Sequence, residues 1–288
     1  MEHLDDQTVK SLEKQANAIR ISIIEMLMSA GSGHTAGPLG MADIFTALYF
    51  HSLRHNPKDP LWEDRDRLVL SNGHICPVLY ATMAHAGYFS LDKLATLRKF
   101  GSSLQGHPHR EWLPSIETSS GPLGSGLSQA VGMAIADRID RGGASGRYVY
   151  ALLSDGELDC GNTWEAAMLA GKEKLHNLIG FIDRNNIQID GFTEDIMPLE
   201  PLRAKWEAWN WHVIEINGHD FEEIIGAINQ AKAVFEKPTM ILAHTIPGKG
   251  VPAFEKRFEW HGKPPTPKEG EMALDELRVF GDKIVSNG

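Results

Sequence analysis

Two short polar motifs stand at the ends of two neighbouring apolar runs in this sequence of 288 residues. Asp155-Gly156 ends one run and Asn185-Asn186 ends the next, about one strand-helix-strand unit later. Neighbouring parallel strands lie ~5 Å apart, so side chains at both ends can reach one ion. A carboxylate, a carboxamide and the main-chain oxygen of Ile187 would suit Mg²⁺, Ca²⁺ or Mn²⁺ carrying a diphosphate. Asp-Gly and Asn-Asn are also common turn formers, and their spacing alone leaves both interpretations open.

A glycine-rich loop is a second candidate for binding an anion. Gly121, Gly124 and Gly126 directly precede a predicted helix, where backbone amides and the helix dipole can face a phosphate or a flat ring. The loop does not follow a strand as G-x-G-x-x-G, so the dinucleotide fingerprint is absent. Taken by itself, the loop is a weak signal that an ordinary helix start explains more simply.

Four histidines lie in loops, each next to a glycine: His34, His74, His107 and His261. Glycine lets a ligand approach closely, and imidazole exchanges protons near neutral pH. A single loop histidine is usually a surface group, whereas four of them favour a convergent site. A zinc site is the alternative, but the His and Cys spacings match no common zinc pattern, and His107-x-His109 is the only close pair.

Composition argues against several classes of protein. The formal charge of −10 and the lack of a Lys/Arg run argue against nucleic-acid binding. The acidic, polar amino terminus argues against a secretory signal, and no apolar stretch approaches the ~20 residues of a membrane span. The two cysteines, Cys76 and Cys160, form no C-x-x-C pair, which argues against a disulfide scaffold. We therefore expect a cytoplasmic protein without membrane or nucleic-acid partners.

Five short apolar runs alternate with helix-like segments. Continuous apolar runs are typical of parallel strands buried on both faces. The runs cover residues 67–74, 148–156, 177–186, 211–220 and 239–250. The pattern predicts a single α/β domain over 1–288, with three layers (α/β/α) and a mainly parallel sheet whose ligands bind beyond the carboxyl ends of the strands. We expect an exposed, Pro-rich extension from about residue 263 and a last helix over 273–285.

Helix signals separate these runs. Apolar residues at helical spacing predict one helix over 8–30 and another over 41–49. Asn162 and Glu165 have the spacing of a capping box at a helix start, and the same pattern begins at Asp220.

Taken together, these motifs resemble the amino-terminal, diphosphate-binding part of transketolase. The resemblance runs from about Ala18 to His261. Its ordered motifs are GSGHTAGPLGMADIFTALY, DRLVLSNGH, QGHPH, SSGPLGSGLSQAVGMA, SDGEL, IDRNNIQIDG, INGHD, and TIPGKG followed by WHGKPP. The Asp-Gly and Asn signature is shared by thiamine-diphosphate enzymes, whereas the histidine motifs are more specific to transketolase.

The resemblance implies a metal-held thiamine diphosphate. Asp155, Asn185 and the carbonyl of Ile187 would hold the cation, most typically Mg²⁺. Gly156 would lie against the diphosphate, which Asn185 would also touch. The other residues that would contact the cofactor are His74, Gly121, Pro122, Leu123 and His261.

The resemblance also implies ketol transfer, in which a ketose gives a two-carbon unit to an aldose. The cofactor serves as the electron sink. His34 and His107 would bind the hydroxyls and the developing alkoxide of the ketose, and His261 would also face the substrate. Glu165 resembles an acidic residue in the dimer interface near the cofactors.

Family enzymes in one piece continue into a pyrimidine-binding domain and a carboxyl-terminal domain. The missing part supplies a glutamate that activates the cofactor, so we expect one subunit of a split transketolase, inactive alone and assembled as α2β2 with a second chain. The alternatives are an alpha-type subunit of a 2-oxo acid dehydrogenase, a 1-deoxyxylulose-phosphate synthase-like subunit, or a non-catalytic cofactor-binding subunit. The histidine series and the TIPGKG and WHG motifs favour transketolase acting on sugar phosphates.

Overall fold

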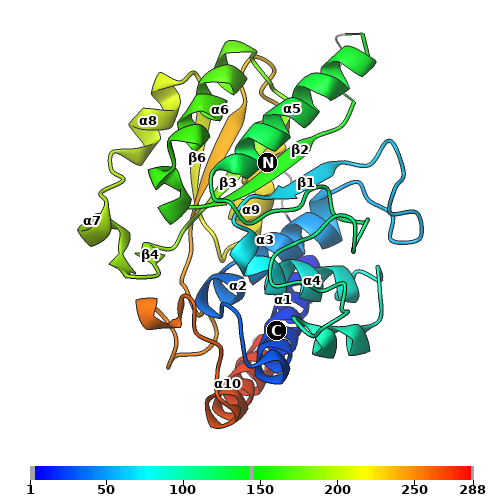
Figure 1. Cartoon of the computed structure of the whole chain (residues 1–288), viewed down its shortest axis with the longest axis vertical. Coiled ribbons are helices and arrows are strands. Elements are labelled where there is room, and N and C mark those ends of the chain that lie inside the picture. Colours follow the sequence, from blue (N-terminus) through cyan, green and yellow to red (C-terminus); the bar gives the residue numbers. More distant parts are fainter. Residues whose placement is uncertain (1–3, 143–145, 287–288) are drawn as a thin grey trace.

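The computed structural model describes residues 4–142 and 146–286. These residues form a five-stranded sheet in the order β1-β2-β3-β7-β6, and every neighbouring pair is parallel (Figure 1). The strands are β1 (Arg67–Leu70), β2 (Val149–Ser154), β3 (Leu178–Arg184), β6 (His212–Asn217) and β7 (Thr239–His244). Each strand lies inside one of the five apolar runs, so the predicted parallel sheet is confirmed.

The strand order places the two polar motifs side by side. β2 pairs directly with β3, in a register that aligns Ser154 with Asp183. Asp155 is the first residue after β2, and Asn185 is the first residue after β3. Every residue of both strands is buried, so packing on both faces of the sheet holds the carboxyl ends that carry the two side chains.

Helices cover both faces of the sheet, which confirms the predicted three-layer architecture (Figure 1). One core includes residues of α1 (Asp6–Ala30), α3 (Ala42–Ala47), α4 (Cys76–His85) and α9 (Phe221–Lys232). The other includes residues of α5 (Ser125–Asp140), α6 (Gly161–Lys172) and α8 (Leu202–Ala208). Alternate residues of β2 supply the two cores: Tyr150 and Leu152 join the first, and Val149, Ala151 and Leu153 join the second.

β6 is an edge strand, and for this strand the expected burial on both faces is wrong. Val213 and Ile216 are buried, whereas Glu215 and Asn217 are exposed. An edge strand has a neighbour on one side alone, so polar side chains can reach water from it. The apolar run at 211–220 indicated a strand correctly but not its position in the sheet.

The amino-terminal helices follow the sequence signals in part. α1 ends as predicted before Gly31, whose φ of 59° gives a left-handed helix cap. The helix expected over 41–49 is instead a series: α2 (Ala36–Gly40), α3 and a π-helical turn at Leu48–Ser52. The cap predicted at Asp220 is confirmed, because its side chain accepts hydrogen bonds from two N–H groups in the first turn of α9.

The capping box expected at Asn162 is absent. α6 begins one residue earlier, at Gly161, and Asn162 lies inside its first turn. Cys160 takes the cap position without a side-chain hydrogen bond. The Asn162 side chain instead packs against the glycine-rich loop, since a Cβ added to Gly124 would collide with its Oδ1 atom.

The carboxyl-terminal helix starts earlier than predicted. α10 spans Pro267–Ser286, and a capping box precedes it: Thr266 N donates to Glu269 Oε2 at 2.9 Å, and Glu269 N donates to Thr266 Oγ1 at 3.3 Å. α10 lies beside α1 (Figure 1), where Asn17 Nδ2 donates to the carbonyl of Leu277 at 3.0 Å. The Pro-rich stretch therefore leads into a docked helix rather than an exposed tail.

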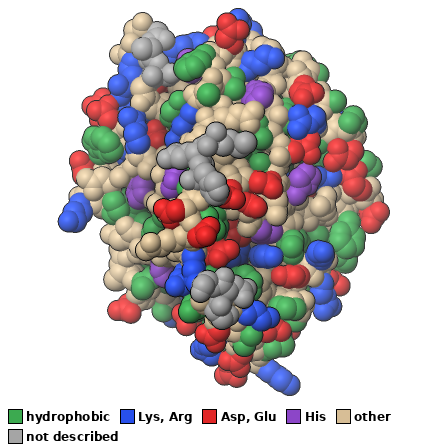
Figure 2. Space-filling model, turned by 180° about the vertical axis from the view of Figure 1, so that it is seen from behind, with side chains coloured by type: hydrophobic (Ala, Val, Ile, Leu, Met, Phe, Trp, Pro, Cys, Tyr) green, Lys and Arg blue, Asp and Glu red, His purple; other side chains and the backbone are tan. Residues whose placement is uncertain are grey.

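One face of the molecule is mixed in charge (Figure 2). On the face seen in Figure 2, Lys and Arg side chains are interspersed with Asp and Glu. Within the described ranges, no helix combines the length and the apolar character needed to cross a bilayer.

Candidate active site at the carboxyl edge of the sheet

Asp155 is fully buried at the end of β2. Its Oδ1 accepts a hydrogen bond from Gly156 N at 2.8 Å, and its Oδ2 accepts from Asn186 N at 2.7 Å and from Arg184 Nη1 at 3.3 Å. Burial nevertheless raises the pKa of the Asp155 carboxyl to about 6, against the opposing effect of these donors. A nearby cation would therefore stabilise the ionised carboxylate strongly.

The orientation of the Asn185 amide is fixed by its neighbours. Nδ2 donates to Asp183 Oδ2 at 2.7 Å, and Oδ1 accepts from Ile187 N at 3.0 Å. Asp183 also accepts a hydrogen bond from the Thr245 hydroxyl. Burial raises the pKa of Asp183 to about 7. These two bonds show that the Asn185 amide oxygen, rather than the nitrogen, faces the turn after β3.

The donors around Asp155 fit a hard cation. They are a carboxylate, a carboxamide oxygen and the main-chain oxygen of Ile187, which begins the short hairpin β4 (Ile187–Gln188) and β5 (Gly191–Phe192). Among the residues that the structure describes, no group of three or more His, Cys, Asp or Glu side chains is arranged to hold a metal ion. Oxygen donors with a single carboxylate are the set that Mg²⁺ accepts when phosphate oxygens complete its shell.

Three of the four predicted histidines come together. The ring centroids of His34 and His74 are 4.9 Å apart, those of His74 and His261 are 5.2 Å apart, and those of His34 and His261 are 5.6 Å apart. His34 follows α1, His74 follows β1, and His261 follows the 3₁₀ turn at Phe258–Trp260. Residues separated by more than 200 positions in the sequence thus form one cluster.

His107 lies at the margin of this cluster. It is exposed, and a Cβ added to Gly121 would lie 3.8 Å from its ring. The loop that carries His107 therefore meets the glycine-rich loop, whose Pro122 and Leu123 are also exposed. The structure places the predicted substrate histidine beside predicted cofactor contacts.

The clustered histidines are poor proton acceptors in the folded chain. Burial lowers the pKa of His34 to about 4, with further lowering by His261, Arg98 and His107. Burial also lowers the pKa of His74 well below its ordinary value, and lowers that of His261. Neutral imidazoles carry one donor and one acceptor nitrogen, so at neutral pH each ring can donate one hydrogen bond to a hydroxyl group and accept another.

Two buried nitrogen atoms in the cluster lack partners. The Nδ1 atoms of His34 and His261 accept or donate no hydrogen bond with the described residues. An unpaired buried polar atom costs free energy, and a bound polar ligand or ordered water would relieve that cost. The cluster is thus suited to binding a molecule with several hydroxyl groups.

Glu157 is a site residue that the sequence reasoning missed. Its carboxylate is fully buried and accepts hydrogen bonds from Gly124 N at 2.5 Å, from Ser154 N at 3.2 Å and from the Ser71 hydroxyl. Ser71 Oγ in turn accepts from Gly126 N at 3.1 Å. These bonds tie the glycine-rich loop to the ends of β1 and β2. The available signal was an acid two residues after Asp155, at the end of a strand that the sequence predicts to be buried.

A second network holds two of the histidine-bearing loops together. His219 Nδ1 and Asp43 Oδ2 are 2.7 Å apart, and Ile246 N donates to His219 Nε2 at 2.7 Å. Because Nε2 accepts a hydrogen bond from Ile246 N, Nδ1 carries the ring proton and donates a hydrogen bond to Asp43. Gly248 N also donates to the carbonyl of Ala36 at 2.9 Å. The loop that leads to His261 is therefore anchored on the segment that follows His34.

Glu165 lies apart from these networks on α6. Its side chain is exposed, as are Met168 and Leu169 on the same helix. This position is compatible with an interface role and does not by itself indicate chemistry.

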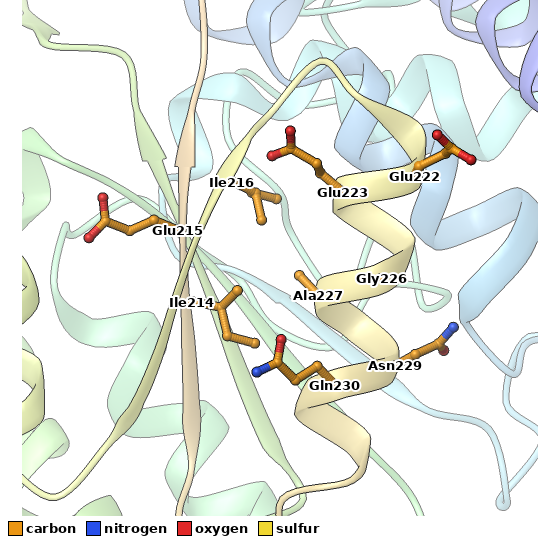
Figure 3. Close-up of a pocket in the computed structure, with 9 residues that line it drawn as sticks. All are labelled: Ile214, Glu215, Ile216, Glu222, Glu223, Gly226, Ala227, Asn229 and Gln230. Atoms are coloured by element: carbon orange, nitrogen blue, oxygen red, sulfur yellow. The ribbon is translucent and has the colours of Figure 1, made fainter. Parts of the chain in front are cut away.

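A groove lies between β6 and α9 at the outer edge of the sheet (Figure 3). Ile214 and Ala227 form part of its apolar lining, and Glu223 lies at one end of it, whereas the Glu215 side chain points away from α9. No residue predicted for the active site lines it, so the groove is separate from the carboxyl-edge site.

Comparison with known proteins identifies the family. The family described as "Transketolase, thiamine diphosphate binding domain" matches residues 11–278. A 6-deoxy-6-sulfo-D-fructose transketolase subunit of Clostridium sp. (strain MSTE9) is 43% identical over 270 residues, which cover 94% of this chain and 97% of the relative. An apulose-4-phosphate transketolase subunit of Phocaeicola vulgatus is 40% identical over 276 residues, which cover 96% and 97%.

Solved structures identify the same family. Transketolase from Leishmania mexicana superposes with a TM-score of 0.86 at 34% identity, and that from Campylobacter jejuni with a TM-score of 0.84 at 36% identity. The matches cover 96% of this chain but 45% and 48% of those enzymes, so the chain spans less than half of their length. This chain therefore belongs to the transketolase family and corresponds to its amino-terminal, thiamine diphosphate binding part.

Proposed function

We propose that this chain is the amino-terminal subunit of a two-chain transketolase, which moves a two-carbon ketol unit from a ketose to an aldose. The observation that carries the proposal is the meeting of the Asp155 and Asn185 motifs at one edge of the sheet, where three histidines also cluster. Relatives of nearly the same length are named as transketolase subunits, which supports a split enzyme.

The chain's own residues would hold thiamine diphosphate through a divalent cation, Mg²⁺ in the first instance. When bound, the cofactor supplies an electron sink for the carbon–carbon bond that breaks. Asp155, Asn185 and the carbonyl of Ile187 would bind the cation, and Gly156 would let the diphosphate approach the backbone. The remaining cofactor contacts in the proposal are His74, Gly121, Pro122, Leu123 and His261.

The histidines would handle protons on the sugar. His34 and His107 would bind its hydroxyl groups and stabilise the alkoxide where negative charge develops, and His261 would face both substrate and diphosphate. Burial lowers the pKa values of His34 and His261, so both rings are mainly neutral at neutral pH, and each can accept one hydrogen bond and donate another. Neutral rings support a role for these histidines in hydrogen bonding to the sugar rather than as fixed positive charges.

A second subunit would complete the site. Large apolar side chains are exposed around it: Leu123, Met168, Leu169, Ile189, Phe192 and Ile196. We propose that this surface contacts a chain carrying the pyrimidine-binding and carboxyl-terminal domains, in an α2β2 assembly with Glu165 at the interface. Exposed apolar area of this kind marks interaction sites.

The names of two relatives indicate the chemical class of sugar that this chain would act on. One is named for a sulfonated ketose and the other for a ketose phosphate, so we propose sugars with an anionic end for this chain. The single-domain organisation over 1–288 and the cytoplasmic location stay predictions.

The proposal is tested by measuring ketol transfer with the chain alone, and with the candidate second subunit, thiamine diphosphate and Mg²⁺. We expect turnover with both chains and none with one. His34→Gln or His107→Gln should abolish turnover while cofactor affinity is retained, and the exposed His51→Gln is the matched control. Robust turnover by the single chain would refute the two-chain requirement, and an active complex unaffected by both histidine substitutions would favour a scaffold role.

A further inference from the structure

Arg98 lies between the loops that carry His34 and His107. Nη1 donates a hydrogen bond to Ser32 Oγ at 2.9 Å, and Nη2 donates to the carbonyl of Gly106 at 3.3 Å. Each bond is made to a residue one or two positions before one of the histidines. The guanidinium thus joins two segments that are about seventy residues apart.

The glycines beside the histidines make this approach possible. A Cβ added to Gly106 would lie 2.8 Å from Arg98 Cζ, and one added to Gly33 would lie 3.8 Å from Arg98 Nε. A side chain at Gly106 would therefore displace the guanidinium. The positive charge also contributes to the lowered pKa of His34 and of His107, after the larger effect of burial.

Arg98 retains unused capacity for an anion. Both of its hydrogen-bond acceptors are neutral oxygens, and in the described parts of the chain no carboxylate forms an ion pair with it. A guanidinium has five N–H donors, so most of them stay available. The residue is exposed although it borders the histidine cluster, so a solute entering the cluster can reach it.

The backbone of Arg98 is held in an uncommon conformation. Its φ is 59°, in the left-handed region that few non-glycine residues adopt. Arg98 N donates to the carbonyl of Leu104 at 2.8 Å, which closes a loop between the 3₁₀ helix at Leu91–Thr96 and the segment that carries His107. The fold therefore fixes the backbone from which the Arg98 side chain extends, and the two hydrogen bonds to Ser32 and Gly106 hold the guanidinium itself.

We propose that Arg98 binds the phosphate or sulfonate group of the sugar substrate at the entrance to the histidine cluster, and so selects anionic sugars. The inference rests on the proposed ketol-transfer function. An exposed guanidinium without an acidic partner is the group best suited to grip a phosphate or sulfonate by two parallel hydrogen bonds. A neutral sugar would gain little from the same contact.

The test compares Arg98→Gln and Arg98→Lys with the wild type in the assembled two-chain enzyme. Each is assayed with a phosphorylated aldose acceptor and with the same aldose lacking phosphate. Arg98→Gln should raise KM for the phosphorylated acceptor about 10- to 100-fold, while KM for the neutral acceptor changes less than about 2-fold. Arg98→Lys should recover part of the loss, because it restores charge without the fork geometry.

Lys99→Gln is the matched control, since it removes the same charge from the neighbouring residue, whose Nζ contacts Ser29 Oγ at 3.3 Å. It should leave both KM values unchanged. Equal losses with the two acceptors would overturn the proposal and show that Arg98 acts through the histidine loops. Unchanged KM values in Arg98→Gln, or a loss as large in Lys99→Gln, would also overturn it.

A binding measurement separates this inference from the proposed function. Titration of the chain with inorganic phosphate, followed by the ring resonances of His34 and His107, should show saturable shifts in the wild type and none in Arg98→Gln. The same titration with methanesulfonate tests whether Arg98 also binds a sulfonate group. No saturable shift with either anion in the wild type would refute the Arg98 site even in an active enzyme. Phosphate binding lost in Arg98→Gln would support it even without ketol transfer.

Discussion

Asn185 Nδ2 donates a 2.7 Å hydrogen bond to Oδ2 of Asp183, which lies two positions earlier, near the end of β3. This bond decides which end of the Asn185 amide is left to face a cation, because the oxygen lies on the opposite side. The Thr245 hydroxyl holds the second oxygen of Asp183, so the orientation of a predicted metal ligand depends on a side chain from the end of β7.

Asp183→Ala should weaken Mg²⁺-dependent binding of thiamine diphosphate by about 10- to 100-fold, as is common when a residue that orients a metal ligand is lost. Isothermal titration calorimetry at a fixed Mg²⁺ concentration would measure the affinity for thiamine diphosphate. Asp183→Asn should recover much of the affinity, since an amide oxygen can still accept from Asn185 while its nitrogen donates to Thr245. The exposed Asp195→Ala is the control. Unchanged affinity in Asp183→Ala would contradict the positioning role.

His34→Gln should make folding less sensitive to acid. In the unfolded chain His34 takes up a proton as the pH falls below its ordinary value of 6.5, whereas burial in the folded chain lowers its pKa to about 4. The unfolded state therefore binds more protons between these values, and the free energy of unfolding falls as the pH falls through this window. Stability from this group is complete above pH 6.5 and lost towards pH 4.

The measurement is urea unfolding at a series of pH values from 4 to 7. Replacing His34 should remove a pH-dependent loss on the order of 2 kcal/mol. The slope will not vanish, because the pKa values of His74, His107 and His261 are lowered in the same direction. The exposed His51→Gln is the comparison, and an identical slope in His34→Gln and the wild type would show that His34 does not carry this dependence.

Glu157→Gln should loosen the glycine-rich loop. The carboxylate accepts three hydrogen bonds, from Gly124 N, Ser154 N and the Ser71 hydroxyl. In glutamine a single oxygen can still accept, and the amide nitrogen that replaces the other oxygen faces a donor without bonding to it. We expect a loss of about 1–3 kcal/mol in the free energy of unfolding and weaker cofactor binding. Ser71→Ala leaves Gly124 N and Ser154 N bonded to Glu157 but removes the acceptor of Gly126 N, so this variant should also lower stability and tests the Ser71 branch of the network by itself. Cofactor affinity unchanged in Glu157→Gln would argue that the loop does not contact the cofactor.

Leu169→Glu should prevent assembly with the second subunit. Leu169 is 44% exposed on α6, beside Met168 at 40%, and a carboxylate there would have to be desolvated in an apolar interface. Light scattering after size-exclusion chromatography would show separate chains, with the circular dichroism of this chain unchanged. Phe235→Glu is the control, since Phe235 is exposed before β7, at the opposite ends of the strands. A normal complex in Leu169→Glu would place the interface elsewhere.

Much of the fold could be read from local patterns. Apolar runs indicated all five strands of the parallel sheet, and Gly31 and Asp220 marked a helix end and a helix start through backbone chemistry that depends on neighbours in sequence. The same local rules failed at Asn162, where packing against Gly124 replaced the expected cap. They also missed the early start of α10, although Thr266 and Glu269 carry the required spacing.

The sequence by itself determined the α/β class, the family, and the identity of the polar motifs at the strand ends, because these depend on residue types and on spacing along the chain. Only the tertiary structure decided which motifs meet. The meeting of His34, His74 and His261, the burial of Glu157 beneath the glycine loop, and the placement of Arg98 between two histidine loops all join residues far apart in the chain. Such contacts follow from strand order and loop packing, and no local pattern encodes them.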